Sequence, residues 1–289
     1  MTCVEPIAAK PVIRERPAVA SERAQLAHAM LANCHFCAHH CGVNRLSGEQ
    51  GLCHAGAQTR FFSAQVEVSD ELELIPTFAL ALSGCDLRCD FCITGASSWN
   101  PGAGAPFNAP AMAAKAKQAL DQGARTIMLL GGEPTIHLPA ALEFVSLLPA
   151  TAKLVWKTNA HGSTEARELL DGMFDVWLAD FKFGNDGCAQ RLARIPDYVR
   201  VAQENLLWAN RQSELIVRHL AMPGHIDCCW RPVAEWLAVE MPGVKVNLRA
   251  GFWPGWHSAR HAELRTTTSK PEADHAWKIA RECALNLVE

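Results

Sequence analysis

The chain has 289 residues, of which 49% are hydrophobic, and a formal net charge of −3. Its length suffices for a large α/β domain with or without a small appendage, and without an excess of basic charge it is not expected to bind nucleic acids generally. No apolar run approaches the ~20 residues that span a bilayer, and the N-terminus lacks the apolar core of a signal peptide. We therefore expect a cytoplasmic protein without a membrane anchor, in which twelve reduced cysteines indicate metal or redox chemistry.

The first 69 residues divide by composition into two segments. Residues 1–22 are rich in proline, alanine and charge and are expected to form a flexible arm. Residues 23–69 carry several cysteines and histidines but too few apolar residues for a core of their own. We interpret them as a cysteine-rich N-terminal extension of the domain that begins at residue 70.

Four cysteines in this extension form a complete set of soft metal ligands: Cys34, Cys37, Cys41 and Cys53. Their spacing differs from the paired Cys-x2-Cys of most zinc ribbons. Bound zinc would explain how a segment so poor in apolar residues folds. An auxiliary iron–sulfur cluster that relays electrons is an equal alternative, and a segment without metal is the third. Neighbouring histidines offer alternative ligands: His35, His39, His40 and His54.

From residue 70 to residue 289, short runs rich in β-branched and aromatic residues alternate with helical patterns. The expected strands cover residues 75–84, 126–132, 153–159, 176–183, 215–222 and 244–251. The expected helices cover residues 109–123, 139–149, 163–173, 198–211 and 230–241, and a closing helix covers 270–288. Strands that are apolar on both faces and alternate with helices indicate a parallel sheet covered by helices.

The expected fold class is α/β, as a partial (β/α)6 TIM-like barrel. An open doubly wound sheet is disfavoured because no Gly-x-Gly-x-x-Gly turn follows the first strand. In parallel α/β barrels, functional groups gather at the carboxyl ends of the strands. The candidate site is therefore expected at that end.

Three cysteines follow the first strand in the segment GCDLRCDFC: Cys85, Cys89 and Cys92. Thiolates select iron–sulfur clusters or zinc, and three of them leave one position of a metal centre open. The alternative is a trio of buried thiols that pack as small hydrophobes. Charged residues between the cysteines argue against that alternative: Asp86, Arg88 and Asp90.

The second strand ends in the segment GGEP, which covers Gly131, Gly132, Glu133 and Pro134. Two glycines allow a backbone to approach a ligand closely. The carboxylate of Glu133 can accept charge-assisted hydrogen bonds from an ammonium group. An ordinary strand-to-helix turn is the alternative for this segment taken alone.

The other strands also end in polar side chains, which would suit a zwitterionic ligand at a common mouth. Residues i and i+2 of a strand share a face, so Lys157 and Asn159 point the same way, as do Asp180 and Lys182. Arg218 ends the apolar run of the fifth strand. Alternatively, these groups form salt bridges with loops or with one another. Four further cysteines follow helix or loop patterns and are expected only to pack: Cys188, Cys228, Cys229 and Cys283.

The Cys-x3-Cys-x2-Cys loop, with an aromatic residue before its last cysteine, resembles the radical S-adenosylmethionine superfamily. The resemblance implies that Cys85, Cys89 and Cys92 hold a [4Fe–4S] cluster and act in catalysis. It also implies that the open iron binds S-adenosylmethionine, and that one electron cleaves this cofactor to methionine and a 5′-deoxyadenosyl radical, which abstracts hydrogen from a substrate. GGEP resembles the superfamily's second motif, which binds the methionine amino group.

Over residues 30–285 the chain is similar to an uncharacterised group described as pyruvate formate-lyase activating enzyme-like. The segments KTN, DFK and RHLAMPG match segments that line the S-adenosylmethionine pocket of the activases, which implies cofactor contacts for Lys157, Asn159, Asp180, Lys182 and Arg218. The activases carry an acidic residue in place of Lys157. We infer that the Lys157 ammonium supplies positive charge near the cofactor carboxylate.

The resemblance departs at the sixth strand, where the segment NLRAGFWPGWHSARH brings aromatic residues beside the expected mouth. This segment stacks on a planar ring of the substrate, shields the radical from water, or only packs as a hydrophobic loop.

The leading functional hypothesis is a radical S-adenosylmethionine enzyme, an oxidoreductase that receives electrons from a donor such as flavodoxin or ferredoxin. Candidate substrates are the glycine loop of a glycyl radical enzyme, another peptide, or a small molecule such as a cofactor precursor. A hypothesis of another class is a non-catalytic iron–sulfur or zinc protein that carries electrons or docks a partner. A zinc hydrolase is disfavoured because the loop offers thiols instead of histidines and carboxylates.

Overall fold

Strands and helices alternate along residues 15–69 and 71–289, which the structure, a computed structural model, describes. The strands are β1 (Arg60–Glu67), β2 (Thr77–Leu82), β3 (Ala105–Pro106), β4 (Thr126–Gly131), β5 (Leu154–Thr158), β6 (Val176–Asp180), β7 (Glu214–Leu220), β8 (Lys245–Arg249) and β9 (Asn286–Leu287). The α-helices are α1 (Arg16–Met30), α2 (Ala96–Trp99), α3 (Ala109–Asp121), α4 (Leu138–Ser146), α5 (Thr164–Leu170), α6 (Asp186–Ala193), α7 (Tyr198–Gln212), α8 (Arg231–Glu240) and α9 (Lys270–Glu282). A π-helical turn, η4 (Ile226–Trp230), precedes α8.

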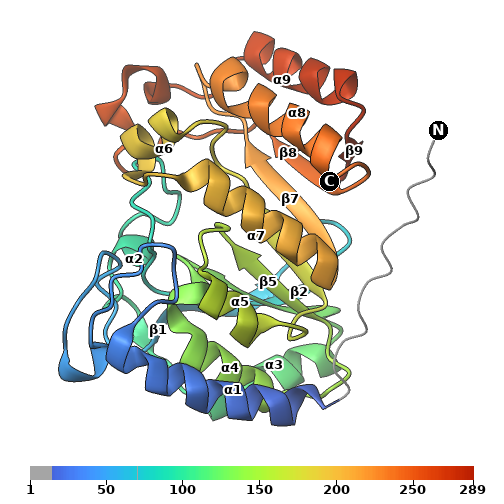
Figure 1. Ribbon diagram of the computed structural model, residues 1–289. Coiled ribbons are helices and arrows are strands. Elements are labelled where there is room, and N and C mark those ends of the chain that lie inside the picture. The colour runs from blue at the N-terminus through green and yellow to red at the C-terminus, as the bar shows by residue number, and fades with distance from the viewer. Residues whose placement is uncertain (1–14, 70) are drawn as a thin grey trace.

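Within the described residues, the strands form one nine-stranded sheet in the order β3-β1-β2-β4-β5-β6-β7-β8-β9. The six predicted strands are β2, β4, β5, β6, β7 and β8, and neighbours among them pair in parallel. Because β3 and β9 remain as edges, this sheet is curved but not closed (Figure 1). The predicted partial barrel is confirmed.

Several elements differ from those expected. The chain just before β2 forms β1, which pairs antiparallel with β2, so the sheet already begins within the expected extension. The closing helix ends at Glu282, and the chain then adds β9 to the edge of the sheet. Helix α6 and the two-residue strand β3 are additional to the predicted elements.

Residues 16–22 belong to a packed helix rather than to the expected flexible arm. Helix α1 starts at Arg16 and packs against α4 (Figure 1). The guanidinium of Arg16 is buried, where it pairs with the Asp175 carboxylate at 2.8 Å and donates to the Ala150 carbonyl at 2.8 Å. A buried, fully engaged charge fixes the start of this helix. Residues 1–14 of the expected arm lie outside the described residues.

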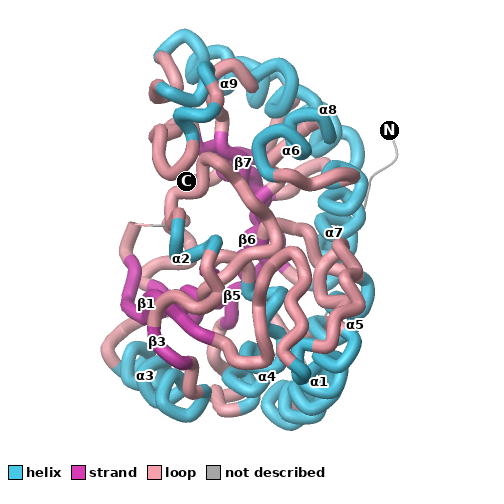
Figure 2. Tube along the Cα trace, turned by 90° about the vertical axis from the view of Figure 1, so that its left-hand side faces the viewer, coloured by secondary structure: helices cyan, strands magenta, loops and turns pink. Residues whose placement is uncertain are grey.

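The helices cover the convex face of the sheet and the opposite face lines the interior, as Figure 2 shows by an outer arc of helices with the strands inside it. Alternate strand residues such as Leu129 and Trp156 pack outward against the helices. Inward-facing residues in the lower part of the sheet form a second apolar cluster: Met128, Val155, Val176, Leu178 and Ile216, with Leu74. No helix within residues 15–69 and 71–289 is both long and apolar enough to cross a bilayer.

The same inward face becomes polar toward the carboxyl ends of the strands. Lys157 lies two residues after Val155, Asp180 two after Leu178, and Arg218 two after Ile216. The interior is therefore sealed by an apolar layer at one end and presents charged groups at the other, beside the end of β2.

Candidate functional site

The loop that carries the three predicted cluster cysteines leaves the carboxyl end of β2. Cys85 and Cys89 are buried and Cys92 is half-buried. Two N–H donors face the Cys85 sulfur, the Leu87 amide at 3.4 Å and the Asn159 side chain at 3.7 Å. Burial raises the pKa of Cys85 well above that of a free thiol and raises the pKa of Cys89 to about 12. Burial alone would keep the Cys85 thiol protonated, whereas the two N–H donors stabilise a negative charge on its sulfur. This combination fits a thiolate that binds a metal.

The paired glycines of GGEP allow the end of β4 to approach the end of β2 closely, and their approach to a ligand stays a prediction. A Cβ added to Gly131 would lie 2.1 Å from the Leu82 carbonyl oxygen, and one added to Gly132 would lie 1.8 Å from the Gly84 carbonyl oxygen. At these positions the Gly132 amide donates to Leu82 and the Glu133 amide donates to Gly84, both at 2.9 Å. The second motif is thereby bonded to the start of the cysteine loop.

The Glu133 side chain is buried and accepts hydrogen bonds from the 3-10 turn that follows it and from the end of β5. Its Oε1 accepts from the Thr135 amide at 3.0 Å, the Thr135 hydroxyl at 2.5 Å and the Thr158 hydroxyl at 2.9 Å. Its Oε2 accepts from the Asn159 amide at 2.8 Å. Burial, followed by the negative charge of Asp86, raises the pKa of Glu133 to about 7. Because the carboxylate is costly to charge here, a cation beside it would be bound favourably.

Asp86 connects the cysteine loop to Asn159 and to the N-terminal extension. Its buried carboxylate accepts from the Asn159 side chain at 2.8 Å and pairs with His161 at 2.7 Å. The His39 ring, from the extension, lies 3.0 Å from the Asp86 carbonyl oxygen. The pair of Asp86 and His161 therefore anchors the cysteine loop to the segment that follows β5. Neither residue was predicted as a site residue, because 75 residues separate the two in the sequence.

The charged residues predicted on the other strand ends do converge, and they are paired. Lys182 and Asp180 form an ion pair at 2.5 Å, and Arg218 pairs with the buried carboxylate of Glu71. Lys182, then Arg218 and Lys157, counteract the burial of Asp180 and lower its pKa. The positive charge of Lys182 also acts on Cys89. Lys157, Lys182 and Arg218 thus lie near Asp180 at the mouth of the barrel, with Lys182 beside the cysteine loop.

The aromatic segment after β8 packs onto the cysteine loop. The Asp90 carboxylate pairs with Arg260 and with His261, both at 2.9 Å, and the His257 amide donates to the Asp90 carbonyl at 2.8 Å. The Trp256 and Trp99 rings contact edge to face, with centroids 5.6 Å apart. This segment therefore covers one side of the loop.

The four cysteines of the extension lie in one neighbourhood. The Cys37 thiol interacts electrostatically with Cys53 and Cys41, and Cys53 does so with Cys34. The buried guanidinium of Arg45 lies 3.7 Å from the Cys34 sulfur. Their sulfurs do not form a group within 4.8 Å of one another among the described residues. A metal at this set remains a prediction.

A further group of ligand side chains was not recognised from sequence. Cys188, Cys228 and Cys229, which were expected only to pack, meet His225 between α6 and η4. The spacing of His225, Cys228 and Cys229 was a visible local signal, but Cys188 lies on another element, 40 residues before Cys228. Cys283, at the end of α9, does not belong to this group.

One family model and one relative match the part of the chain that carries the cysteine loop. Residues 81–237, more than half of the chain, match the model of the radical SAM superfamily. The uncharacterised protein MJ0674 of Methanocaldococcus jannaschii is 29% identical over 284 residues, which cover 94% of this chain and 81% of that protein.

Two solved structures of SuiB from Streptococcus suis share the fold. SuiB bound to its precursor peptide SuiA matches with a TM-score of 0.53 and 14% identity over 70% of this chain, and SuiB bound to S-adenosylmethionine matches with a TM-score of 0.50 and 15% identity over 71%. The alignments cover 46% and 47% of the SuiB chains, so this chain spans less than half of their length. The family match covers the cysteine loop, GGEP and the charged strand ends, and the chain belongs to the radical SAM superfamily.

Proposed function

We propose that this chain is an enzyme in which Cys85, Cys89 and Cys92 hold a [4Fe–4S] cluster that binds S-adenosylmethionine through its fourth iron. The observation that carries the proposal is the loop of three thiols at the carboxyl end of β2, two of them buried, with N–H donors directed at Cys85. When bound, the cluster supplies the electron that cleaves S-adenosylmethionine to methionine and a 5′-deoxyadenosyl radical.

The GGEP segment supports the cofactor's amino group in this proposal. A carboxylate offers about four acceptor positions, and Oε2 of Glu133 accepts from one donor, the Asn159 amide. That oxygen retains capacity for the methionine ammonium, whose positive charge would offset the cost of burying the carboxylate. Gly131, Gly132 and Pro134 position Glu133 next to the cysteine loop.

The charged strand ends support the rest of the cofactor. Lys157 and Lys182 lie on the inward face above the apolar layer, where an ammonium attracts the methionine carboxylate. Asp180 holds Lys182 through an ion pair, and Arg218 is itself held by its ion pair with Glu71. Asn159 acts from the cluster side, through its contacts with Cys85 and Asp86.

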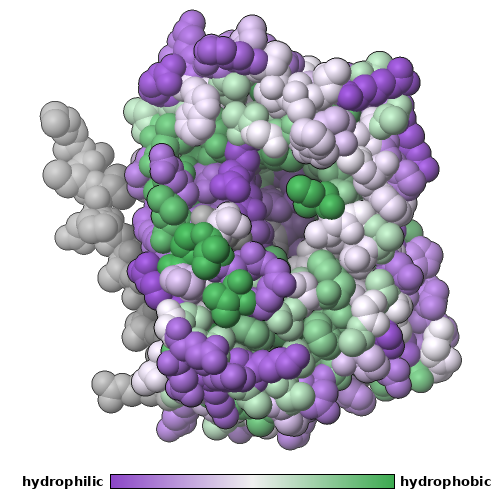
Figure 3. All heavy atoms as spheres, turned by 180° about the vertical axis from the view of Figure 1, so that it is seen from behind, coloured by the Kyte–Doolittle hydropathy of each residue, from purple (hydrophilic) through white to green (hydrophobic). Residues whose placement is uncertain are grey.

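The substrate class that we propose is a polypeptide segment, which includes the glycine loop of a glycyl radical enzyme. The face seen in Figure 3 is hollowed, with hydrophilic atoms deep in the hollow and hydrophobic atoms on parts of its rim. Exposed apolar side chains flank the cysteine loop, since Ile93 is 90% exposed and Trp253 is 71% exposed. Such side chains favour contact with a macromolecule. The SuiB complex with a precursor peptide gives a precedent within the fold.

The N-terminal cysteine set is proposed as a second metal centre. Cys34, Cys37, Cys41 and Cys53 hold either zinc or an auxiliary iron–sulfur cluster that passes electrons from a donor such as flavodoxin or ferredoxin. Metal counts on the Cys34→Ala variant separate these roles. Loss of zinc with retained cofactor cleavage supports a structural ion, whereas loss of iron with slower cleavage supports electron relay.

The test is anaerobic reconstitution of the chain followed by reduction with dithionite in the presence of S-adenosylmethionine. We expect 5′-deoxyadenosine from the wild type and none from Cys89→Ala. Cys283→Ala should give wild-type amounts, because Cys283 lies at the end of α9 and outside the cysteine loop. A reconstituted, folded wild type that forms no 5′-deoxyadenosine would instead support a non-catalytic electron carrier or docking protein. Adding candidate glycine-loop peptides and small molecules, and following hydrogen transfer from each, then tests the substrate class.

A further inference from the structure

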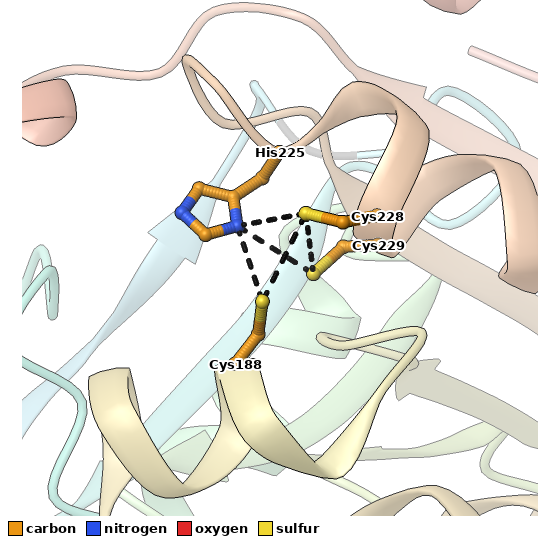
Figure 4. A group of neighbouring side chains, drawn as sticks. All are labelled: Cys188, His225, Cys228 and Cys229. Atoms are coloured by element: carbon orange, nitrogen blue, oxygen red, sulfur yellow. Dashed lines mark hydrogen bonds between the residues drawn. The ribbon is translucent and has the colours of Figure 1, made fainter.

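Three cysteines and one histidine form a compact group on the side of the barrel near α6. Cys188 projects from α6, and His225, Cys228 and Cys229 project from the turn that leads into α8 (Figure 4). All four ligand atoms lie within 4.8 Å of one another. Cys229 and His225 are buried, Cys188 is half-buried and Cys228 is exposed.

The distances between these atoms match those around a tetrahedral zinc ion. Zn–S bonds of about 2.3 Å and Zn–N bonds of about 2.0 Å imply S···S separations of about 3.8 Å and N···S separations of about 3.5 Å. The Cys228 sulfur lies 3.8 Å from that of Cys188 and 4.0 Å from that of Cys229. The Nδ1 atom of His225 lies 3.5, 3.3 and 3.7 Å from the sulfurs of Cys188, Cys228 and Cys229.

We propose that Cys188, His225, Cys228 and Cys229 bind one zinc ion in a closed, structural Cys3His site. Four protein ligands complete a tetrahedral shell, which is the arrangement of structural zinc sites. The site is separate from the cysteine loop and from the N-terminal cysteine set, and it does not depend on the proposed radical chemistry.

Other chemistry fits this group less well. Cysteines at the corners of a cubane cluster each bind a different iron atom, so their sulfurs stand farther apart than the ligands of one ion. A disulfide between Cys188 and Cys228 would need an S–S distance of about 2.05 Å, and it would leave His225 and Cys229 directed at it without a role. One ion uses all four side chains.

Side chains around the group suit a metal-bound imidazole and thiolates. The Glu263 carboxylate lies 3.4 Å from Nε2 of His225, where it can accept a hydrogen bond from an Nε2–H group. In that tautomer the Nδ1 lone pair is free to bind a metal ion between the three sulfurs. Arg191 pairs with Glu263 at 2.6 Å, which holds this carboxylate beside the imidazole, and its positive charge acts on the Cys188 thiol. The Asn185 side chain lies 3.3 Å from the Cys188 sulfur and 3.8 Å from the Cys229 sulfur, within reach for N–H···S bonds.

The site joins helix α6 to the π-helical turn η4, and α6 in turn contacts the cysteine loop. A Cβ on Gly184, before α6, would lie 2.2 Å from the Cys229 carbonyl oxygen, so the two segments pack in direct contact. The other end of α6 is hydrogen-bonded to the cysteine loop. The Arg88 amide donates to the Ala193 carbonyl, and the Asp90 amide donates to the Leu192 carbonyl. A zinc ion here would fix α6 and, through it, the loop of Cys85, Cys89 and Cys92.

The test is the zinc content of the full chain, purified without oxygen from cells grown with zinc. We expect Cys228→Ser and Cys188→Ser each to bind one zinc ion fewer than the wild type, and the matched control Cys283→Ser to bind as many. Glu263→Gln, which changes a positioning residue, should weaken zinc retention against a chelator by about 10- to 100-fold. A folded Cys228→Ser variant with the full zinc content would overturn the proposal, as would a Cys188–Cys228 disulfide in the wild type.

A measurement on the unchanged protein covers the case in which the cysteine variants do not fold. The zinc-edge X-ray absorption spectrum of the wild type should contain a nitrogen neighbour together with sulfur. Cobalt substituted for zinc should give the intense visible absorption of a tetrahedral thiolate site. A zinc spectrum without nitrogen, or wild-type protein without zinc, would overturn the assignment.

Discussion

The side-chain amide of Asn159 lies 3.7 Å from the Cys85 sulfur and is held there by a 2.8 Å hydrogen bond to Asp86. An N–H donor stabilises negative charge on a cluster sulfur, and the reduced cluster carries more of that charge than the oxidised one. Asn159→Ala should therefore shift the midpoint potential of the cluster to a more negative value, measured by a redox titration followed by electron paramagnetic resonance. Asn205→Ala is the matched control, because Asn205 donates to the Gly162 and Val201 carbonyls. An unchanged potential in Asn159→Ala would show that this contact does not tune the cluster.

The contact between Gly132 and Gly84 predicts a large effect from a single methyl group. In Gly132→Ala the added Cβ would meet the Gly84 carbonyl oxygen at 1.8 Å, so the end of β4 must separate from the cysteine loop. We expect a lower melting temperature and less iron per chain after reconstitution. Gly251→Ala, at the end of β8, is the control, because nothing lies within 4 Å of its added Cβ. Equal iron content in the two variants would contradict the proposed link between GGEP and the loop.

The ion pairs of Asp90 predict that the aromatic segment protects the cluster. Asp90→Ala removes the contacts to Arg260 and His261 that hold this segment on the loop. We expect normal iron content under anaerobic conditions but faster loss of the cluster's visible absorption after exposure to air. Asp274→Ala removes an exposed pair with Lys270 on α9 and should bleach at the wild-type rate. If both variants bleach alike, the segment has no covering role.

The six parallel strands of the sheet could be predicted because their signals are local. Each predicted strand is an apolar run between turn signals, and polar residues mark its carboxyl end. The edge strands β3 and β9 have only two residues each, so no periodicity reveals them. Strand β1 lies in a segment that composition assigned to the extension, and its pairing with β2 depends on tertiary contact.

The site was predictable as a set of residues and less so as a set of contacts. Spacing alone brought out Cys85, Cys89 and Cys92. The close contact of Gly131 and Gly132 with the backbone of another strand was not predicted, because the sequence does not reveal which segment lies beside them. The zinc ligands Cys188 and His225 were missed because 37 residues separate them and only the fold brings them together.

The buried pair of Arg16 and Asp175 predicts a strong effect on stability. Asp175→Ala would leave the buried guanidinium with carbonyl partners only and should lower the free energy of unfolding by about 3–5 kcal/mol. Glu204→Ala, which removes an exposed pair with Arg200, should cost less than about 1 kcal/mol. Anaerobic urea unfolding of both variants measures the difference. Similar losses in the two would mean that α1 is not held by this pair.

Buried His137 predicts that stability falls as the solution becomes acidic. Its Nε2 donates to the Ser83 carbonyl at 2.6 Å, and its Nδ1 lies 3.1 Å from the Thr59 hydroxyl, which can donate to a neutral ring. Burial, followed by the charge of Arg45, lowers the pKa of His137 to about 3. Between pH 6.5 and pH 3 the unfolded chain therefore binds a proton that the folded chain does not, so stability decreases as pH falls through this range.

The size of this effect can be measured with a conservative variant. From pH 7.5 to pH 5.5 His137 should reduce the free energy of unfolding by about 1.4 kcal/mol. His137→Gln keeps a donor for Ser83 without the titrating ring, so its loss over this interval should be smaller than that of the wild type by this amount. His219, whose pKa burial lowers to about 4, acts in the same direction and keeps part of the slope in that variant. His28→Gln is the control for a histidine-to-glutamine exchange, because His28 is exposed on α1, and its loss over this interval should equal that of the wild type. Equal losses in the wild type and in His137→Gln would show that the His137 ring is not held neutral by the fold.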